Sequence, residues 1–369
     1  MKKVILSGGG TGGHIYPAVA VAEALKRRCG NDIEILFVGA EGKMEMEKIP
    51  ALGYKIVGLP IWGLQRHFTL KNFALPLHIA KSVIKARELL KIYKPDVVAG
   101  FGGYASAPIL WTAQRKKIPT VIQEQNSYAG MANKVLAKRA VSVCVSYDGM
   151  EKFFPAEKLV MTGNPLRESF YKSQQNADRK AALDYYGFTP DLPVLLVVGG
   201  SLGTRTLNNM MKSWIVTLGG DAPVQVIWQT GKFYDAEMSA FTETYPTANI
   251  RRMPFIERMD YAYAAADLVI SRSGACTVSE LCLAGKPTIF VPSPNVAEDH
   301  QTKNAKALVD KGAAEMVADA DAVECCIDLA LKLLNNPKRL KTLSANIQKL
   351  AIVDSADRVA AEIEKLLGR

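Results

Sequence analysis

The chain has 369 residues, of which 49% are hydrophobic and 22% are charged, a balance typical of a globular protein rather than a disordered or fibrous one. No apolar run reaches about 18 residues, and Met1-Lys2-Lys3 leads directly into a short strand, so neither a membrane-spanning helix nor a signal peptide is predicted. The net charge is +10, and residues 1–164 hold the whole excess, with 23 Lys and Arg against 12 Asp and Glu. This half is therefore expected to face an acidic partner, either nucleic acid or an anionic membrane surface.

Short apolar strands alternate with helices in the first half of the chain, which predicts an α/β fold with a parallel sheet. The first strand, Val4–Ser7, leads into a glycine-dense turn. Pro17 suits the first turn of a helix, so the next helix is expected to start at His14 or later. Its body is predicted at Ala18–Arg28, and strands are predicted at Ile33–Val38, Val97–Gly100, Thr120–Gln123 and Val141–Ser146.

The turn after the first strand reads SGGGTGGHIYP and allows two interpretations. Gly8, Gly10 and Gly13 satisfy the G-x-G-x-x-G spacing of dinucleotide-binding folds. The acidic residue that such a fold needs would be Glu41, which lies later than the usual spacing of about 20 residues. The other interpretation is a loop that lets a substrate approach the backbone, with His14 as general base for a hydroxyl group. The run of glycines before His14 favours this second interpretation.

Residues 61–94 combine large apolar side chains with many basic ones. The apolar residues at 79, 83, 86, 90 and 93 follow helical spacing and predict the buried face of a helix. The preceding aromatic residues do not fit this stripe, which predicts either an interfacial membrane patch or a loop whose aromatic side chains pack inward. The predicted membrane patch consists of Trp62, Leu64, Phe68 and Phe73 with Arg66 and Lys71.

The same order of elements restarts near residue 190, after the segment TGNPLR at 162–167, where Gly and Asn-Pro predict a hinge. A buried strand at Pro193–Val198 leads into GGSLGTRTLN and a helix from about Thr206. This repeat predicts two Rossmann-like, doubly wound domains facing each other across a cleft, over residues 1–163 and 164–344, with a helix at about 345–369 crossing back to the first. Further strands are expected at Val224–Trp228, Ile250–Met253, Leu268–Ser271 and Thr288–Val291.

The segment SRSGACTVSELCLAGKP, at 271–287, predicts a helix from about Cys276 to Ala284. The free N–H groups at its start suit a diphosphate. Thr277 and Glu280 share one face of this helix, and a carboxylate there suits a ribose diol. Ordinary polarity of a capped first turn is the alternative. The turn GGSLG at 199–203 offers a second nest of N–H groups.

Six segments together resemble the MurG family of N-acetylglucosaminyltransferases, which complete lipid II in peptidoglycan synthesis: GGGTGGHIYPAVAVAEAL, GFGGYASAP, QEQNSYAGMANK, TGNPLR, GGSLGTRTLN and SRSGACTVSELCLAGKPTIFVPSP with EDHQTKNA. The resemblance runs in order from Lys3 to at least Ala314. It implies a GT-B fold, UDP-N-acetylglucosamine (UDP-GlcNAc) as donor, and lipid I, an undecaprenyl-diphosphate-linked N-acetylmuramoyl-pentapeptide, as acceptor. It also implies transfer with inversion to a β-1,4 linkage, and a peripheral location on the cytoplasmic face of the cell membrane.

The resemblance also implies the role of individual residues. Phe255 and Ile256 match the pair that covers the uracil, and Gln301 matches the residue that selects the GlcNAc hydroxyls. Arg167 and Ser201 match positions beside the diphosphate. The remaining donor contacts are Thr11, Gly12, Gly13 and Asn126, and the segment Ala275, Cys276, Thr277, Val278, Ser279 and Glu280, with Glu280 on the ribose hydroxyls. Two positions depart from the family pattern, Leu202 where Gln is frequent and Gln123 where His is frequent.

His14 is the expected base, helped by Glu124, Tyr104 or Asn126. No Asp-x-Asp follows a strand, so N–H groups and cations are expected to stabilise the leaving UDP without an obligatory metal or cofactor. The expected partners are UDP-GlcNAc, lipid I, an anionic membrane surface and other cell-wall synthesis proteins, with no nucleic acid. Another GT-B enzyme, such as a UDP-GlcNAc 2-epimerase or a diacylglycerol glycosyltransferase, and an NAD-dependent oxidoreductase are the alternatives.

Overall fold

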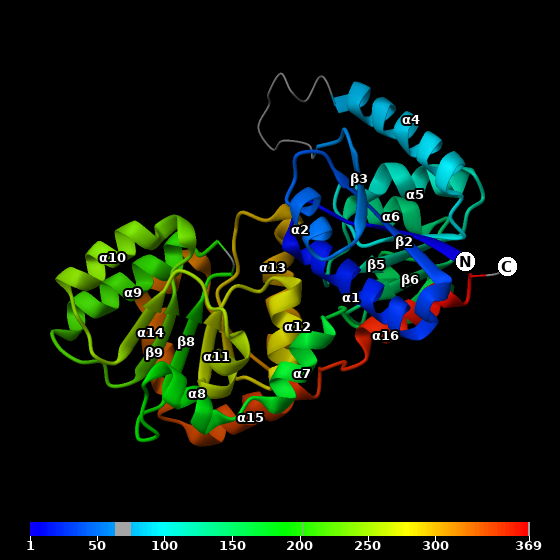
Figure 1. Ribbon diagram of the computed structural model, residues 1–369. Helices are drawn as coiled ribbons and strands as arrows, with labels where there is room; N and C mark the ends of the chain where they lie inside the picture. Colours follow the sequence, from blue (N-terminus) through cyan, green and yellow to red (C-terminus); the bar gives the residue numbers. More distant parts are fainter. Residues whose placement is uncertain (63–74, 201, 368–369) are drawn as a thin grey trace. The chain divides into compact units, whose positions relative to one another are not determined.

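The structure is a computed structural model that describes residues 1–62, 75–200 and 202–367 and divides into two compact units (Figure 1). Unit 1 comprises Met1–Glu168 and Ile352–Arg369, and unit 2 comprises Ser169–Ala351. Both boundaries lie a few residues later than the sequence placed them. The first moves because Leu166 is buried and Asn164 O accepts a hydrogen bond from Ser355 Oγ at 2.9 Å, within unit 1. The second moves because helix α15, Pro337–Gln348, packs in unit 2, where Ser344 Oγ donates to Gly285 O at 2.7 Å.

Unit 1 is built on a seven-stranded parallel sheet in the order β3-β2-β1-β4-β5-β6-β7. The predicted strands are present, and the sheet also contains β3 and β7, which the sequence did not indicate. Its strands are β1 Lys2–Ser7, β2 Ile33–Ala40, β3 Lys55–Leu59, β4 Val97–Gly100, β5 Thr120–Glu124, β6 Ser142–Val145 and β7 Leu159–Met161. Strand order reverses direction between β1 and β4, as in doubly wound folds.

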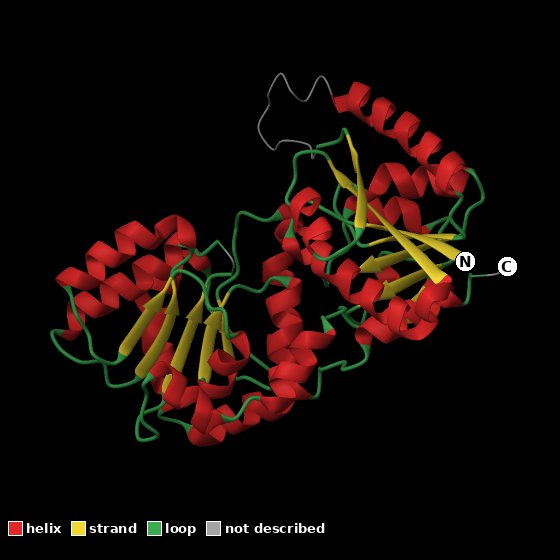
Figure 2. Ribbon diagram, viewed as in Figure 1, coloured by secondary structure: helices red, strands yellow, loops and turns green. Residues whose placement is uncertain are grey.

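Helices bury both faces of this sheet, because successive side chains of a strand point to opposite faces. Val4 and Leu6 belong to the core that contains α1 and α16, whereas Ile5 belongs to the core that contains α4, α5 and α6. Figure 2 shows the helices packed around the strands. The helices of unit 1 are α1 Gly12–Cys29, α2 Glu45–Ala51, α4 Leu75–Tyr93, α5 Ser106–Arg115, α6 Met131–Ala137 and α16 Ser355–Glu364.

Unit 2 repeats the arrangement with a six-stranded parallel sheet in the order β10-β9-β8-β11-β12-β13, so the predicted fold class of two doubly wound parallel-sheet domains is confirmed. Its strands are β8 Val194–Val198, β9 Gln225–Gln229, β10 Ile250–Met253, β11 Leu268–Ser271, β12 Thr288–Phe290 and β13 Glu315–Met316. Its helices are α8 Arg179–Tyr186, α9 Arg205–Leu218, α10 Asp235–Thr244, α11 Met259–Ala265, α12 Ala275–Ala284, α13 His300–Val309, α14 Ala322–Leu334 and α15 Pro337–Gln348, and α7 Glu168–Asn176 begins at the boundary.

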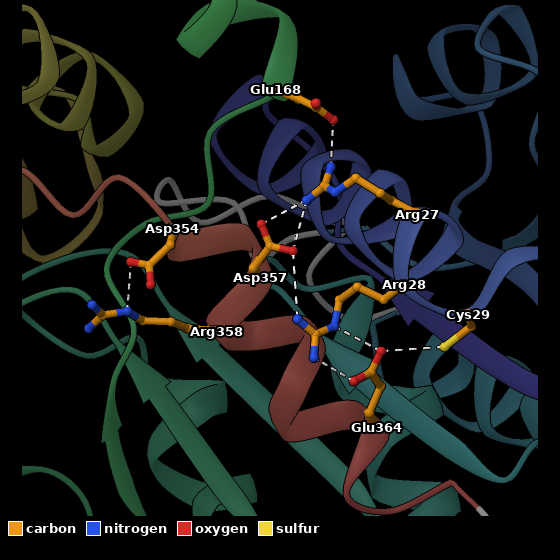
Figure 3. Close-up of polar contacts among 8 residues, drawn as sticks. All are labelled: Arg27, Arg28, Cys29, Glu168, Asp354, Asp357, Arg358 and Glu364. Atoms are coloured by element: carbon orange, nitrogen blue, oxygen red, sulfur yellow. Dashed lines mark hydrogen bonds and ion pairs between the residues drawn. The ribbon is translucent and has the colours of Figure 1, made fainter.

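The C-terminal helix α16 packs on α1 in unit 1, through apolar contacts that include Ile363 and Val359. Ion pairs flank these contacts (Figure 3). Arg27 Nη2 lies 2.7 Å from Asp357 Oδ2, and Arg28 Nη2 lies 2.8 Å from Glu364 Oε2. These side chains are partly exposed, and such pairs contribute about 0–1 kcal/mol each. The apolar face therefore holds α16 in place.

The substitution Ile363→Ala is expected to lower the free energy of unfolding by about 2–5 kcal/mol, because it leaves a cavity at a fully buried position. Arg28→Ala on the facing helix should cost less than about 1 kcal/mol. Denaturant unfolding of both variants measures the difference. Equal losses would show that the ion pairs contribute as much as the apolar contacts and would contradict this account.

Candidate active site

The fold places the glycine-rich motifs at two equivalent positions. In an open parallel sheet, ligands bind beyond the carboxyl ends of the strands where strand order reverses. In unit 1 this position is formed by the loops after β1 and β4, which contain Gly8–Thr11 and Phe101–Ala105. In unit 2 it is formed by the loops after β8 and β11, which contain Gly199–Thr204 and Arg272–Gly274. Each unit thus offers one candidate ligand-binding edge.

His14 lies in the first turn of α1, half-buried, and its ring is held from the Nδ1 side. Nδ1 lies 3.0 Å from Gly9 O and 3.1 Å from Thr11 Oγ1. A carbonyl oxygen only accepts hydrogen bonds, so we assign the proton of the neutral ring to Nδ1 and the lone pair to Nε2. An Nε2 lone pair is the form that a general base requires.

Two glycines of the loop after β4 make room for the His14 ring. A Cβ at Gly102 would lie 3.0 Å from His14 Cδ2, and a Cβ at Gly103 would lie 3.2 Å from Nδ1. Both glycines have positive φ, +91° and +77°, which other residues rarely adopt. The motif GFGG therefore has a steric function beside the histidine.

Helix α1 starts at Gly12, earlier than the sequence predicted, and Pro17 lies inside it. A proline within a helix leaves the carbonyl four residues earlier without its N–H partner. Here that carbonyl is Gly13 O, and it accepts a hydrogen bond from Gln125 Nε2 at 3.1 Å. The same nitrogen donates to Phe101 O at 3.0 Å, so buried Gln125 links the first turn of α1 to the loop after β4. Gln125 was not among the predicted site residues.

Glu124 is buried at the end of β5 and accepts hydrogen bonds from the loop that follows it. Its donors are Asn126 N at 3.1 Å, Gly130 N at 3.0 Å, and Asn133 Nδ2 at 2.9 Å. Asn126 Nδ2 also donates to Glu124 Oε1, at 3.3 Å. Burial raises the pKa of the Glu124 carboxyl, and these donors oppose that rise. The arrangement suits a carboxylate that holds the loop before α6.

Tyr104 lies in the loop after β4 and faces Gly10, where a Cβ would lie 3.2 Å from its ring. Burial raises the pKa of its phenol, and the charge of Glu45 adds to the rise. The phenol therefore stays protonated near neutral pH and suits a hydrogen-bond donor rather than a base.

Arg167 belongs to unit 1, whereas the sequence had placed it in the second domain. Its guanidinium carbon lies 4.9 Å from the centre of the Tyr16 ring on α1, a cation–π contact. The side chain is exposed and available to an anion.

In unit 2, Gln229 forms hydrogen bonds with the loop after β8; it was not among the predicted site residues. Gly199 N donates to Gln229 Oε1 at 3.2 Å, and Gln229 Nε2 donates to Gly200 O at 2.9 Å. Gln229 Nε2 also lies 3.4 Å from Pro254 O, which joins this loop to the residue before Phe255. Ser201 lies outside the described residues, and Leu202 is 80% exposed.

The helix α12 begins at Ala275, one residue earlier than predicted, and its N-cap Gly274 makes no side-chain cap. No capping side chain therefore competes with an anion for the N–H groups of the first turn. Ser279 Oγ donates back to Ala275 O at 3.0 Å, and the Ala275 and Val278 side chains are buried. Ligand contacts at these three positions would run through the backbone, whereas Cys276 and Thr277 are half-buried.

Glu280, one helical turn further along α12, is oriented by a tyrosine. Tyr263 Oη of α11 donates to Glu280 Oε2 at 3.3 Å. Burial and the Glu280 charge raise the pKa of the Tyr263 phenol well above its usual value, so the phenol remains a donor. The carboxylate is half-buried, which suits a group that meets a ligand hydroxyl.

Gln301 lies in the first turn of α13 and is tied to the loop before α12. Its backbone O accepts from Ser273 Oγ at 2.8 Å, and its Oε1 accepts from Ser293 N at 2.9 Å. The side-chain amide nitrogen keeps its capacity to donate. Phe255, after β10, is 45% exposed, whereas the neighbouring Ile256 side chain is buried.

Of the predicted membrane patch, only Trp62 lies within the described residues; Leu64, Arg66, Phe68, Lys71 and Phe73 lie outside them. The Trp62 ring packs on the His78 ring of α4, with centroids 3.6 Å apart. The predicted buried stripe of α4 holds at Ala86 and Leu90 but is wrong at Ile79, which is exposed because the first turns of α4 extend beyond the sheet core. Leu77 and Ile84, seven residues apart, are exposed as well.

No helix in the described part of the chain is long and apolar enough to cross a membrane. Residues 1–62, 75–200 and 202–367 also contain no group of three or more His, Cys, Asp or Glu that could hold a metal ion.

Comparison with known proteins identifies the family. Residues 4–145 match the glycosyltransferase family 28 N-terminal domain, and residues 194–359 match its C-terminal domain. A Parabacteroides distasonis protein is 52% identical over 100% of this chain and 99% of its own length. A Bacteroides thetaiotaomicron protein is 51% identical over 99% of this chain and 97% of its own length. Both are named UDP-N-acetylglucosamine–N-acetylmuramyl-(pentapeptide) pyrophosphoryl-undecaprenol N-acetylglucosamine transferase.

The crystal structure of Acinetobacter baumannii MurG matches this structure with a TM-score of 0.80 and 32% sequence identity, covering 99% of this chain and 100% of that one. The two parallel-sheet units are therefore those of a GT-B glycosyltransferase. The chain belongs to the MurG family of N-acetylglucosamine transferases.

Proposed function

We propose that the protein transfers GlcNAc from UDP-GlcNAc to the MurNAc 4-hydroxyl of lipid I, forming lipid II for peptidoglycan. The observation that carries this proposal is the 52% identity, over the whole chain, with a protein named for this transfer. The chain is accordingly a hexosyltransferase, with no cofactor of its own in the proposed reaction.

Unit 2 supplies the groups for the donor. The N–H groups at the start of α12, with Thr277, face the diphosphate, and Glu280 accepts hydrogen bonds from the ribose diol. Phe255 offers an exposed ring for the uracil, while Ile256 contributes only its backbone because its side chain is buried. The amide nitrogen of Gln301 donates to GlcNAc hydroxyls, where a positioned polar group discriminates between epimers better than an apolar wall.

Unit 1 supplies the base and cationic groups. His14 Nε2 accepts the proton of the acceptor 4-hydroxyl as its oxygen bonds to C1 of GlcNAc. The bond from C1 to the diphosphate oxygen breaks in the same step, UDP leaves with the electron pair, and attack from the opposite face inverts C1. Arg167 stabilises the charge on the leaving diphosphate, together with Ser201 and the backbone N–H groups of the glycine turn and of the start of α12, which unit 2 supplies. Thr11, Gly12, Gly13 and Asn126 border the reacting sugar.

The test is UDP release with and without acceptor. The proposal expects UDP to form in proportion to added lipid I analogue, and labelled GlcNAc to appear in the lipid fraction. Conversion of UDP-GlcNAc to its 2-epimer without acceptor would support the epimerase alternative, and transfer to diacylglycerol would support the other GT-B alternative.

We further propose that unit 1 docks on the anionic cytoplasmic leaflet, where a polyprenyl-linked acceptor resides. Support comes from the basic excess of residues 1–164 and from Leu77 and Ile84, which are exposed on α4 and separated by Lys81. Apolar side chains flanked by lysines suit a membrane interface. The partly packed Trp62 ring, against His78 at the start of α4, borders the same surface. Contact with other cell-wall synthesis proteins remains a prediction.

The double variant Leu77→Ser and Ile84→Ser is expected to weaken binding to phosphatidylglycerol-containing vesicles at least about tenfold, because each lost apolar side chain removes about 1.5–3 kcal/mol when fully buried. Val216→Ser, which changes an exposed apolar residue of unit 2, is the matched control and should bind normally. Vesicle sedimentation measures both. Unchanged binding of the double variant, or equal binding of the wild type to neutral vesicles, would refute this docking surface.

A further inference from the structure

A buried carboxylate lies behind the first glycine loop. Glu45 opens α2, its side chain is fully buried, and its Oε1 accepts a hydrogen bond from Ala40 N at 3.0 Å. Gly10 N donates to both carboxylate oxygens, at 3.3 Å to Oε1 and 3.2 Å to Oε2. A Cβ at Gly9 would overlap Oε1, and a Cβ at Gly39 would lie 2.5 Å from Glu45 Cγ. Two glycines from different loops therefore leave the space that this carboxylate fills.

The Gly9–Gly10 peptide connects Glu45 to His14. Its N–H, which belongs to Gly10, donates to the Glu45 carboxylate. Its C=O, which belongs to Gly9, lies 3.0 Å from His14 Nδ1 and accepts the proton there. Hydrogen bonds in a chain polarise one another, so a carboxylate on the N–H side makes the carbonyl a stronger acceptor. This favours the neutral ring with the proton on Nδ1 and the lone pair on Nε2.

We propose that Glu45 is a positioning residue for the transfer reaction. Acting through the Gly9–Gly10 peptide, it fixes the ring and tautomer of His14 and stabilises the imidazolium that forms when Nε2 takes the acceptor proton. The proposal rests on the proposed role of His14 as base. The arrangement resembles the carboxylate that orients histidine in a catalytic triad, with one peptide group inserted between the two side chains.

The other side chains described here beside the first glycine loop carry no charge, in contrast to Glu45. Glu45 from α2 and Tyr104 from the loop after β4 both face Gly10. Tyr104 stays neutral, because burial and the Glu45 charge raise the pKa of its phenol. Thr11, beside Nδ1, and Gln125, which directly follows β5 and contacts Gly13 O, are uncharged.

The variant Glu45→Gln tests the proposal, because the amide keeps one acceptor oxygen for Ala40 N and Gly10 N but removes the charge. We expect kcat for transfer to a short-chain lipid I analogue to fall about 10- to 100-fold, by analogy with the loss when a partner that orients a metal-ligating histidine is removed. The donor KM should not change. The acidic limb of the pH–rate profile should move to lower pH, because the imidazolium loses a stabilising negative charge.

Glu41→Gln is the matched control. Glu41 is an exposed carboxylate that directly follows β2 and pairs with Lys85 Nζ at 2.7 Å. Its replacement should leave kcat and the pH–rate profile unchanged. A residue that only supports the fold would lower the melting temperature without moving the pH limb, so a Glu45→Gln variant with reduced stability and an unmoved limb overturns the proposal.

Nitrogen-15 NMR of the imidazole rings gives a readout that does not depend on the variant folding. The chain has four histidines, and the His14 signals are assigned by their loss in His14→Gln. The proposal expects the neutral wild-type ring to carry its proton on Nδ1; a neutral ring protonated on Nε2 overturns it. A His14→Ala variant with full activity would instead overturn the base assignment, so the two failures are distinguishable.

Discussion

The His14→Ala variant is expected to lower kcat for GlcNAc transfer by roughly 10²–10⁴, the usual contribution of a positioned general base. The donor KM should stay unchanged, because the groups proposed for the uracil and the ribose, Phe255 and Glu280, lie in unit 2 and His14 is proposed to contact the acceptor. Steady-state kinetics with a soluble lipid I analogue measure both parameters. The acidic limb of the pH–rate profile should disappear in the variant, since the group whose protonation stops the reaction is gone.

His78→Ala is the matched control for this variant, because His78 is also a unit 1 histidine but contacts Trp62 and Pro60 O rather than the glycine loop. It should retain wild-type kcat. A loss below about tenfold in His14→Ala would remove His14 as the base. A water molecule would then be a better candidate for the general base than Glu124, because the Glu124 carboxylate already accepts hydrogen bonds from its own loop.

The second large effect is expected at Glu280. Replacement by alanine should raise the donor KM about 10- to 150-fold, which corresponds to the roughly 1.5–3 kcal/mol of a hydrogen bond to a charged group. Glu280→Gln should give a smaller rise, because the amide retains one acceptor for a ribose hydroxyl. Isothermal titration with UDP measures the binding share of the effect.

Tyr263→Phe separates orientation from direct contact. It removes the hydroxyl that donates to Glu280 Oε2 but keeps the buried ring, so it should weaken UDP binding by less than Glu280→Ala. Wild-type UDP affinity in a folded Glu280→Ala variant would place the ribose elsewhere.

The strands that carry the site were predictable because they are short, apolar runs with glycine at their end or in the turn that follows. The segment Val97–Gly100 was predicted at its observed bounds, and Leu268–Ser271 likewise. The sequence did not indicate β3, because this strand begins with a polar residue and contains a glycine. It did not indicate β13, because this strand has only two residues. Helix α1 began earlier than expected because Gln125, distant in sequence, satisfies the carbonyl that Pro17 leaves unpaired.

The supporting residues of the site carry no local sequence signal. Glu45 lies between Glu41 and Glu47 in a charged stretch of the sequence, and nothing in this stretch indicates that its carboxylate is buried against two glycines. Gln125 and Gln229 lie at or just after strand ends, and Tyr263 lies in a short helix; their partners are backbone groups or a carboxylate far along the chain. Such pairings depend on tertiary packing and cannot be predicted from a single sequence.

We propose that GlcNAc moves to the acceptor with inversion, by a base on unit 1 and a donor site on unit 2. NMR of the product formed from UDP-[¹³C]GlcNAc and a lipid I analogue tests it most directly. The expected result is one GlcNAc joined to the MurNAc 4-position with the large H1–H2 coupling of a β-anomer. An α-anomer, or free GlcNAc and UDP with no linked product, would contradict it.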